Sequence, residues 1–476
     1  MKKKYLFLLA LALSSNIFTA QTFAASNFTL LSNISPETGT GVKYSACWGY
    51  TQPITNKEFA IACSKNGTYF IDVTNPTTPT VSAYVPGTSS NGTWRETKTY
   101  QNYCYVVSDD GSSTGFQVID MSTLPATVTV VSSNNSLFSR GHACWVDGNK
   151  LYVSGVTYST GATSSMNVYS LANPAAPVLL RSLNQDYSFI NYVHDEHVRN
   201  DTIFASCGYQ GLYVFKYNTV ANTFTQLGSL TSYTSSGYNH ATSWTPNGQT
   251  LVMLDEVPAS LPIKVVDVSN LSNMNVVATS NQYPQTTPHN PWVVNNQYCF
   301  ISSYQDGTQL YDISNPSAPF LAGYFDTYYQ AGGNNNTWSG SAYDGQWGLY
   351  AYFPSKNIFA LDRQNGVFMI KSHLFQNTVT AVKSNTESNF DMVIYPNPAK
   401  NELQFNLPIT AIDADLQVKI YNSQGKLVSI KNTNELTKIN TVHRKLNTTE
   451  LSNGLYYFTL ISNGEVLTTK KIVISK

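Results

Sequence analysis

A short phrase recurs along this chain and constrains its fold more than any other feature. It reads KNGTYFIDVTNPTTP at Lys65–Pro79 and returns as QDGTQLYDISNPSAP at Gln305–Pro319, with weaker copies between them. Each copy contains a tight turn, an apolar run suited to a β-strand, and a polar break around an Asn-Pro pair. Repeats of about 20 to 50 residues are typical of units that bury their hydrophobic faces only against their neighbours.

Seven apolar runs precede these turns and set the number of repeat units. Their first residues are 44 to 60 residues apart, and they are Phe59, Tyr103, Lys150, Ile203, Thr250, Tyr298 and Ile358. A second apolar run follows each of them, and many copies add an outer run after the proline. Four short strands per unit are typical of a β-propeller. We predict an all-β propeller of seven blades, with six as the alternative, because an array of β-sandwiches would not explain the near-constant spacing.

The two ends of the repeat region predict how the ring closes. The last copy stops after Gly366–Lys371 without an outer run, whereas Phe28–Ile34 is an isolated apolar run that resembles the outer runs. We expect this N-terminal strand to complete the last blade, because closure removes an open sheet edge.

The beginning and the composition of the chain indicate export. Residues 1–24 combine a basic start, a short apolar stretch and small residues, as a signal peptide does. We find no later apolar run of about 18 residues, so we expect no transmembrane span. Charged residues are 12% of the chain, the net charge is +0 and no basic stripe is visible, so we expect no nucleic-acid partner. These features predict a protein that passes through the periplasm and is secreted or held at the outer cell surface.

The composition changes after the last repeat. We predict the propeller over residues 28–373, a polar linker over 374–389 and a second domain over 390–476. Alternating apolar residues with turn signals, such as those at Tyr395–Pro398 and Asn453-Gly454, predict a small immunoglobulin-like β-sandwich in the last segment.

Three motifs in this segment carry a family resemblance. They are Tyr395–Pro398 (YPNP), Ile420–Asn422 followed by Gly425-Lys426, and Leu451 followed by Gly454–Tyr457. Residues 390–476 thereby resemble the C-terminal sorting domain of type IX secretion substrates from Bacteroidetes. The resemblance implies that the type IX machinery is a partner and carries the chain through the outer membrane. The alternative is a generic immunoglobulin-like adhesion module.

The repeat region carries a second resemblance. Several stretches are similar to the LVIVD-repeat, choice-of-anchor B group of surface propellers, namely Cys47–Pro79, Thr93–Asp109, Tyr192–Val198 (YVHDEHV), Gln305–Pro319, Phe325–Tyr328 and Gly345–Lys371. The resemblance implies a secreted propeller that carries interchangeable anchoring devices. It implies no settled activity, so enzyme function stays open, with a non-enzyme expected.

Six cysteines lie in or near the apolar runs, at Cys47, Cys63, Cys104, Cys144, Cys207 and Cys299. Their places in these runs predict small buried hydrophobic side chains rather than disulfides. Because an exported chain permits disulfides, Cys47 and Cys63 are the first pair to test.

Four histidines occur once per repeat, at His142, His194, His240 and His289, with spacings of 52, 46 and 49 residues. Each precedes its apolar run by eight to ten residues, which places it near the start of an innermost strand at the mouth of the central channel. The corresponding place holds Trp94-Arg95 in the second repeat and Cys47-Trp48 in the first. The turn after each second strand lies on the same face, and these turns carry Asp109, Asp110, Asp255, Glu256 and Asp306.

The histidines and carboxylates admit three interpretations. The side chains can fix the blades by hydrogen bonds, hold a divalent metal ion, or perform acid–base chemistry. His197 lies three residues after His194, on the opposite face of a strand, so the pair is a poor chelate.

We predict a secreted or surface propeller that binds an extracellular glycan or protein ligand through its top face. The candidate residues are Trp94, Arg95, His142, His194, His240, His289, Asp255 and Glu256, and the four histidines are the candidate metal ligands. The alternative is a metal-dependent hydrolase or lyase that uses the histidine ring.

Overall fold

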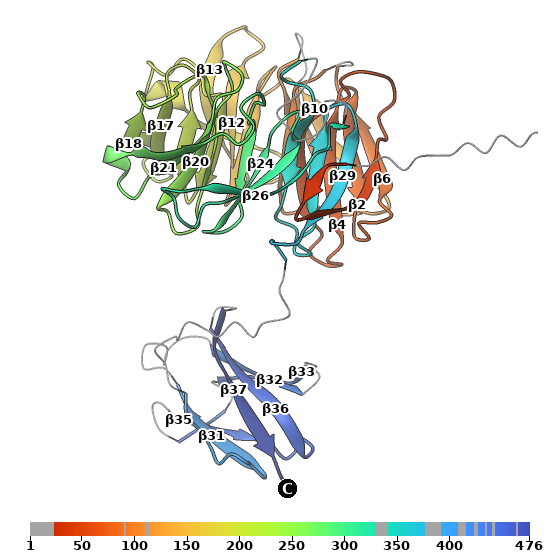
Figure 1. Cartoon of the computed structure of the whole chain (residues 1–476), viewed down its shortest axis with the longest axis vertical. Helices are drawn as coiled ribbons and strands as arrows, with labels where there is room; N and C mark the ends of the chain where they lie inside the picture. The colour runs from red at the N-terminus through yellow and green to blue at the C-terminus, as the bar shows by residue number, and fades with distance from the viewer. Residues whose placement is uncertain are drawn as a thin grey trace, which may run out of the picture. The chain divides into compact units, whose positions relative to one another are not determined.

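The computed structural model describes residues 23–89, 92–110, 115–329, 341–376, 392–407, 416–422, 427–433, 436–439, 443–462 and 465–476. The chain forms two compact units, Met1–Asn377 and Thr378–Lys476 (Figure 1). The signal peptide predicted for residues 1–24 lies outside the described residues except for its last two. The linker predicted for 374–389 lies outside them from residue 377 onward.

The described part of the first unit contains seven antiparallel sheets, as predicted. The innermost strands are β3 (Tyr44–Thr51), β7 (Arg95–Tyr100), β11 (Ala143–Asp147), β15 (Asp195–Arg199), β19 (Asn239–Trp244), β23 (Asn290–Val293) and β27 (Gln346–Tyr350). The second strands are β4 (Glu58–Ser64), β8 (Tyr103–Ser108), β12 (Lys150–Thr157), β16 (Thr202–Ser206), β20 (Thr250–Asp255), β24 (Tyr298–Ser302) and β28 (Ile358–Asp362). The third strands are β5 (Gly67–Asp72), β9 (Phe116–Asp120), β13 (Thr163–Ser170), β17 (Leu212–Asn218), β21 (Ile263–Asp267), β25 (Thr308–Asp312) and β29 (Gly366–Ser372). The outer strands are β6 (Thr80–Pro86), β10 (Thr129–Asn134), β14 (Val178–Ser182), β18 (Thr223–Leu230), β22 (Asn275–Ser280), β26 (Phe320–Phe325) and β2 (Phe28–Ile34).

The innermost strands of neighbouring blades lie against one another around the ring, and β27 of the last blade contacts β3 of the first. Side chains of adjacent blades share hydrophobic clusters; one joins Phe59, Ile61 and Phe70 of the first blade to Val106 and Ile119 of the second. The apolar runs therefore fill the spaces between blades as well as the blades themselves. All six cysteines are buried in these regions and free, which confirms the prediction that they act as small hydrophobic side chains.

The N-terminal strand β2 completes the last blade by pairing with β29, which confirms the predicted closure (Figure 1, red beside cyan). Gly366 opens β29 with φ +92°, and a Cβ at this position would lie 2.6 Å from the carbonyl oxygen of Ile34. The Asn365-Gly366 turn therefore requires glycine where the two ends of the ring meet. The sequence did not predict β1 (Ala25–Ser26), which adds a fifth strand to the sixth blade by pairing with β26.

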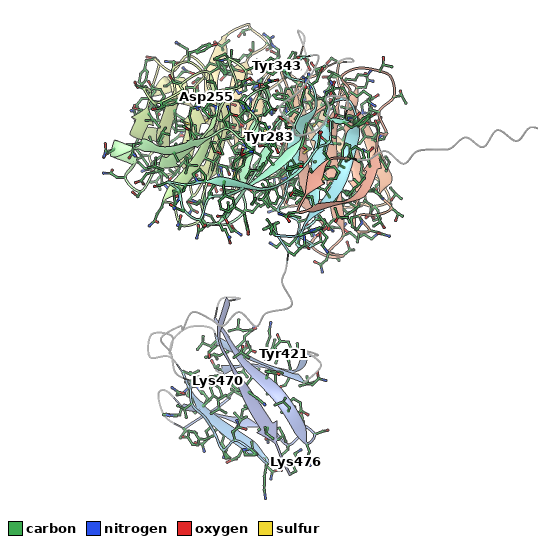
Figure 2. The ribbon with its side chains drawn as sticks, in the orientation of Figure 1. Asp255, Tyr283, Tyr343, Tyr421, Lys470 and Lys476 are labelled. Atoms are coloured by element: carbon green, nitrogen blue, oxygen red, sulfur yellow. The ribbon has the colours of Figure 1, made fainter. Side chains whose placement is uncertain are left out.

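The described part of the second unit contains two four-stranded antiparallel sheets. One contains β30 (Ile394–Tyr395), β31 (Glu402–Asn406), β35 (His443–Asn447) and β34 (Thr437–Lys438), and the other contains β33 (Leu427–Asn432), β32 (Leu416–Asn422), β36 (Gly454–Ser462) and β37 (Glu465–Ile474). Both sheets contribute to one core, in which the rings of Phe405 and Phe458 lie 4.8 Å apart. The immunoglobulin-like character of this unit stays a prediction. Figure 2 marks Tyr421 on β32 and Lys470 on β37.

The described residues contain two short 3₁₀ turns, η1 (Leu183–Gln185) and η2 (Leu271–Asn273). Within that part of the chain, no helix has the length and apolar character needed to cross a membrane.

Candidate functional site

The four histidines of the repeats form a row across neighbouring blades. Their ring centroids are 4.2 Å apart between His142 and His194, 4.3 Å between His194 and His240, and 4.3 Å between His240 and His289. The backbone amides of His194 and His289 donate to the carbonyl oxygens of Ser206 and Ser302 on the adjacent second strands. These hydrogen bonds hold His194 and His289 just before their innermost strands, and His240 lies in β19 itself, as the spacing predicts.

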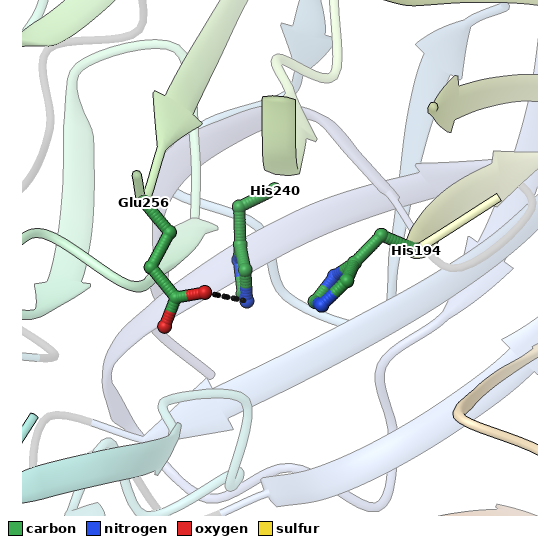
Figure 3. Close-up of side chains that lie close together, drawn as sticks. All are labelled: His194, His240 and Glu256. Atoms are coloured by element: carbon green, nitrogen blue, oxygen red, sulfur yellow. Dashed lines mark ion pairs between the residues drawn. The ribbon is translucent and has the colours of Figure 1, made fainter. Parts of the chain in front are cut away.

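Two carboxylates approach this row from the turns that follow second strands. Asp109 Oδ2 lies 2.5 Å from Nδ1 of His142. Glu256 lies between two rings, with Oε2 3.8 Å from Nε2 of His240 and Oε1 3.7 Å from Nε2 of His289. Figure 3 shows the carboxylate of Glu256 facing His240, with the ring of His194 beyond it.

The surroundings shift the pKa values of the histidines in different directions. Burial acts to lower the pKa of His142, but the hydrogen bond and negative charge of Asp109 outweigh it and raise that pKa. Burial lowers the pKa of His194 and His289 well below the ordinary histidine value, and it also lowers the pKa of His240. The last three imidazoles are therefore neutral at neutral pH and keep a nitrogen lone pair.

A cavity of about 350 Å³ opens above the histidines. Its lining includes all four histidines and Glu256, and its other residues are Trp94, Val257, Tyr304, Ser341, Tyr343, Trp347 and Arg363. These residues come from six of the seven blades and their turns, so the cavity lies at the mouth of the central channel. Trp94 is 44% exposed and offers an indole to this cavity.

A second layer of side chains lies deeper in the channel, three residues after the histidine layer. Trp145 follows His142 by three positions and Trp292 follows His289 by three, and both indoles contact Trp48 at centroid distances of 5.9 and 5.6 Å. The ammonium of Lys98, three residues after Arg95, lies 4.6 Å from the ring of Trp48. This layer therefore places contacting aromatic rings beneath the histidines.

The predicted match of Cys47-Trp48 to the histidines is therefore wrong. Trp48 belongs to the deeper layer, and Cys47 is buried in a cluster between the first and last blades. The β3–β4 turn spans residues 52–57, whereas the β11–β12 turn spans only 148–149. Counting eight to ten residues back from the second strand therefore gives the wrong residue of the innermost strand in the first blade. His197 also belongs to the deeper layer and stacks on Trp145 at 4.6 Å, so it does not pair with His194 as a chelate.

Two further candidate residues, Asp255 and Arg95, are buried and bind other parts of the propeller. Asp255 is fully buried and forms an ion pair with Lys264 of 3.2 Å. It faces away from the cavity that its neighbour Glu256 enters. Arg95 is 3% exposed, and its guanidinium donates to the carbonyl oxygens of Ser64 and Ser89.

The other predicted aspartates also lie apart from the row of histidines. Asp110 accepts a hydrogen bond from the backbone amide of Trp94. Burial and the negative charge of Asp326 together raise the pKa of Asp306 to about 7.

Sequence reasoning missed six residues of the cavity, namely Val257, Tyr304, Ser341, Tyr343, Trp347 and Arg363. The sequence contained a signal for Tyr304. It follows the start of its apolar run by six residues, as Asp109 and Glu256 do, and this spacing predicts a place at the channel mouth. Its hydroxyl donates to Oε1 of Glu256 at 2.8 Å. Trp347 occupies the histidine place of the last blade, and its indole lies 4.7 Å from the ring of His289.

Two family models match parts of the chain. The LVIVD repeat matches residues 263–281 and 293–327, which lie in the fifth and sixth blades. The secretion system C-terminal sorting domain matches residues 393–475, nearly the whole second unit. This chain carries LVIVD repeats and a secretion sorting domain. The second unit is thus a type IX sorting domain, and the chain is destined for the cell surface or the medium. These matches do not favour the alternative of a metal-dependent hydrolase or lyase.

Solved propellers resemble the chain at low identity. The WD40 repeats of RRP9 are 11% identical over 74% of this chain and 99% of that one, with a TM-score of 0.48. U3-55K is 11% identical over 72% and 98%, and the Cps50 (Swd1) propeller domain of Myceliophteria thermophila is 11% identical over 72% and 99%, both with a TM-score of 0.48. None of the curated proteins compared with the chain matches it.

Proposed function

We propose that this protein is an exported interaction module that binds an extracellular glycan in the cavity at the channel mouth. The observation that carries this proposal is the cavity itself, which measures about 350 Å³ and is lined from six blades. Cavities of about 300 to 1,000 Å³ are typical of small-molecule sites. The histidines form the floor of this cavity, and the aromatic layer of Trp48, Trp145 and Trp292 lies beneath them.

The side chains of the cavity suit a sugar. The rings of Trp94, Tyr343 and Trp347 offer flat apolar faces, which can pack against the C–H faces of a pyranose. Glu256 and Arg363 offer charged hydrogen-bonding groups between these rings. A sugar needs both kinds of contact, because its hydroxyl groups lose water on binding and must find new partners.

A glycan array probed with the mature chain tests this proposal. We expect binding to a defined group of glycans, and we expect Trp94→Ala to lower the affinity by about tenfold or more, as loss of an aromatic anchor usually does. Phe320→Ala is the matched control, because Phe320 is 57% exposed on the outer strand β26. An array without binding, or equal affinities for Trp94→Ala and the wild type, would remove support for the cavity as a glycan site.

A further inference from the structure

The floor of the cavity contains a set of ligand atoms suited to one metal ion. His194, His240 and Glu256 each offer one ligand atom, and these atoms lie within 4.8 Å of one another (Figure 3). Ligands that hold one zinc ion at about 2.1 Å in a tetrahedral arrangement lie about 3.4 Å apart. The 3.8 Å separation of His240 Nε2 from Glu256 Oε2 is close to that value, and no separation within the set exceeds 4.8 Å.

The tautomer of His289 adds a second argument. Its Nδ1 lies 3.1 Å from the carbonyl oxygen of Trp347, and because a carbonyl only accepts, this nitrogen carries the proton. Nε2 of His289 then presents a lone pair toward Oε1 of Glu256 at 3.7 Å. Two acceptors that face each other at this distance repel, and a cation beside them turns the repulsion into attraction.

Arg363 is the cationic side chain in the lining of the cavity, but it is not paired with Glu256. Its guanidinium donates to the carbonyl oxygen of Tyr343. Among the described residues, Glu256 forms ion pairs only with the two histidines. Tyr304, which is 1% exposed, donates its hydroxyl to Glu256 and orients the carboxylate. Such an outer partner is a usual feature of metal sites in proteins.

From this arrangement we infer that His194, His240 and Glu256 bind a divalent transition-metal ion of the Zn²⁺ type at the floor of the cavity, with His289 next to it. Imidazole nitrogens select zinc and related ions, whereas Ca²⁺ and Mg²⁺ prefer all-oxygen sites. Three protein ligands leave a coordination position that faces the cavity. The inference stands without the glycan proposed above, because every ligand belongs to the protein.

Zinc binding by the mature chain tests the inference. The protein is produced without a polyhistidine tag, stripped with a chelator and titrated with Zn²⁺ in the absence of any glycan. We expect one Zn²⁺ per chain. Glu256→Gln should lower the affinity at least about 100-fold, and Tyr304→Phe, which removes only the outer partner, should lower it by about tenfold. Phe320→Ala, on the outer strand β26, and His373→Gln are the matched controls and should bind Zn²⁺ as the wild type does. The absence of glycan from the titration separates this test from the glycan test.

Two measurements keep the result unambiguous. The first is the tryptophan emission of the metal-free Glu256→Gln chain, which shows that the propeller is folded if it equals that of the wild type. We expect it to be equal, because glutamine has the size of glutamate and the side chain is partly exposed. Co²⁺ in place of Zn²⁺ should give a visible spectrum without a thiolate charge-transfer band, because the ligands are imidazole and carboxylate. Absence of stoichiometric Zn²⁺ in the wild type, wild-type affinity in Glu256→Gln, or a thiolate band would each overturn the inference.

Discussion

Replacing Asp255 by asparagine should destabilise the propeller strongly and leave the cavity intact. Asp255 and Lys264 are both fully buried, and Nζ of Lys264 lies 3.2 Å from the carboxylate. The same carboxylate accepts hydrogen bonds from the hydroxyl of Tyr233, the amide of Gly237 and the side-chain amide of Asn239. Removing one partner of a buried ion pair costs about 3 to 5 kcal/mol, because the other charge stays buried. Asparagine keeps one acceptor oxygen, so we expect about 3 kcal/mol.

Urea unfolding followed by tryptophan emission measures this effect. All seven tryptophans precede residue 378, so their emission reports on the propeller and not on the sorting domain. At a slope of about 3 kcal/mol per molar urea, the midpoint should fall by about 1 M. Asp267→Asn is the matched control in the same blade, because Asp267 accepts its hydrogen bonds from Ser269 in a local turn and lies outside the Asp255–Lys264 pair. The control should lose less than about 1 kcal/mol.

The pH dependence supplies a further check on the same reasoning. Burial lowers the pKa of Lys264 even though Asp255 raises it. Without Asp255 the folded-state pKa falls further below that of the unfolded chain, so the unfolded state binds more protons and stability rises with pH. The deficit of Asp255→Asn should therefore shrink as the pH rises toward 10. A deficit below about 1 kcal/mol at pH 7, or loss of Zn²⁺ binding by folded Asp255→Asn, would refute the assignment of Asp255 to the scaffold.

Three further predictions concern export, closure and buried charge. Deleting residues 390–476 should leave a folded propeller trapped inside the cell, and normal secretion of the truncated chain, detected by immunoblot of the medium, would rule out the sorting role. Deleting residues 23–34 removes β2 and exposes the edge of β29. An open strand edge pairs with other chains, so size-exclusion chromatography should show self-association. A monomer as stable as the wild type would contradict the closure of the ring by β2. Burial raises the pKa of Asp362 to about 7, so its folded state binds a proton more tightly than the unfolded state. Wild-type stability should consequently fall relative to Asp362→Asn by up to about 1.4 kcal/mol per pH unit as the pH rises from 5 to 7, and parallel curves would refute the shift.

The amino-acid sequence carries enough information to predict the ring and its closure. The repeat spacing specifies one blade per copy, and the missing outer run of the last copy identifies Phe28–Ile34 as its replacement. The same period brings His142, His194, His240 and His289 to matched places, because residues one blade apart occupy the same height in the channel. The motifs of residues 390–476 are likewise local and need no tertiary structure to be recognised.

Tertiary structure decided which of these residues face the cavity. Asp255 and Glu256 are neighbours in the sequence, but successive side chains of an extended segment point in opposite directions. Asp255 therefore enters the blade beside Lys264, while Glu256 enters the channel beside His240. Trp48 lies in the layer beneath the histidines because the β3–β4 turn is longer than the corresponding turns. The number of residues between Trp48 and the second strand does not reveal this. The sequence by itself determined the number of blades and the row of histidines, whereas only the packed structure decided the direction and depth of each side chain around them.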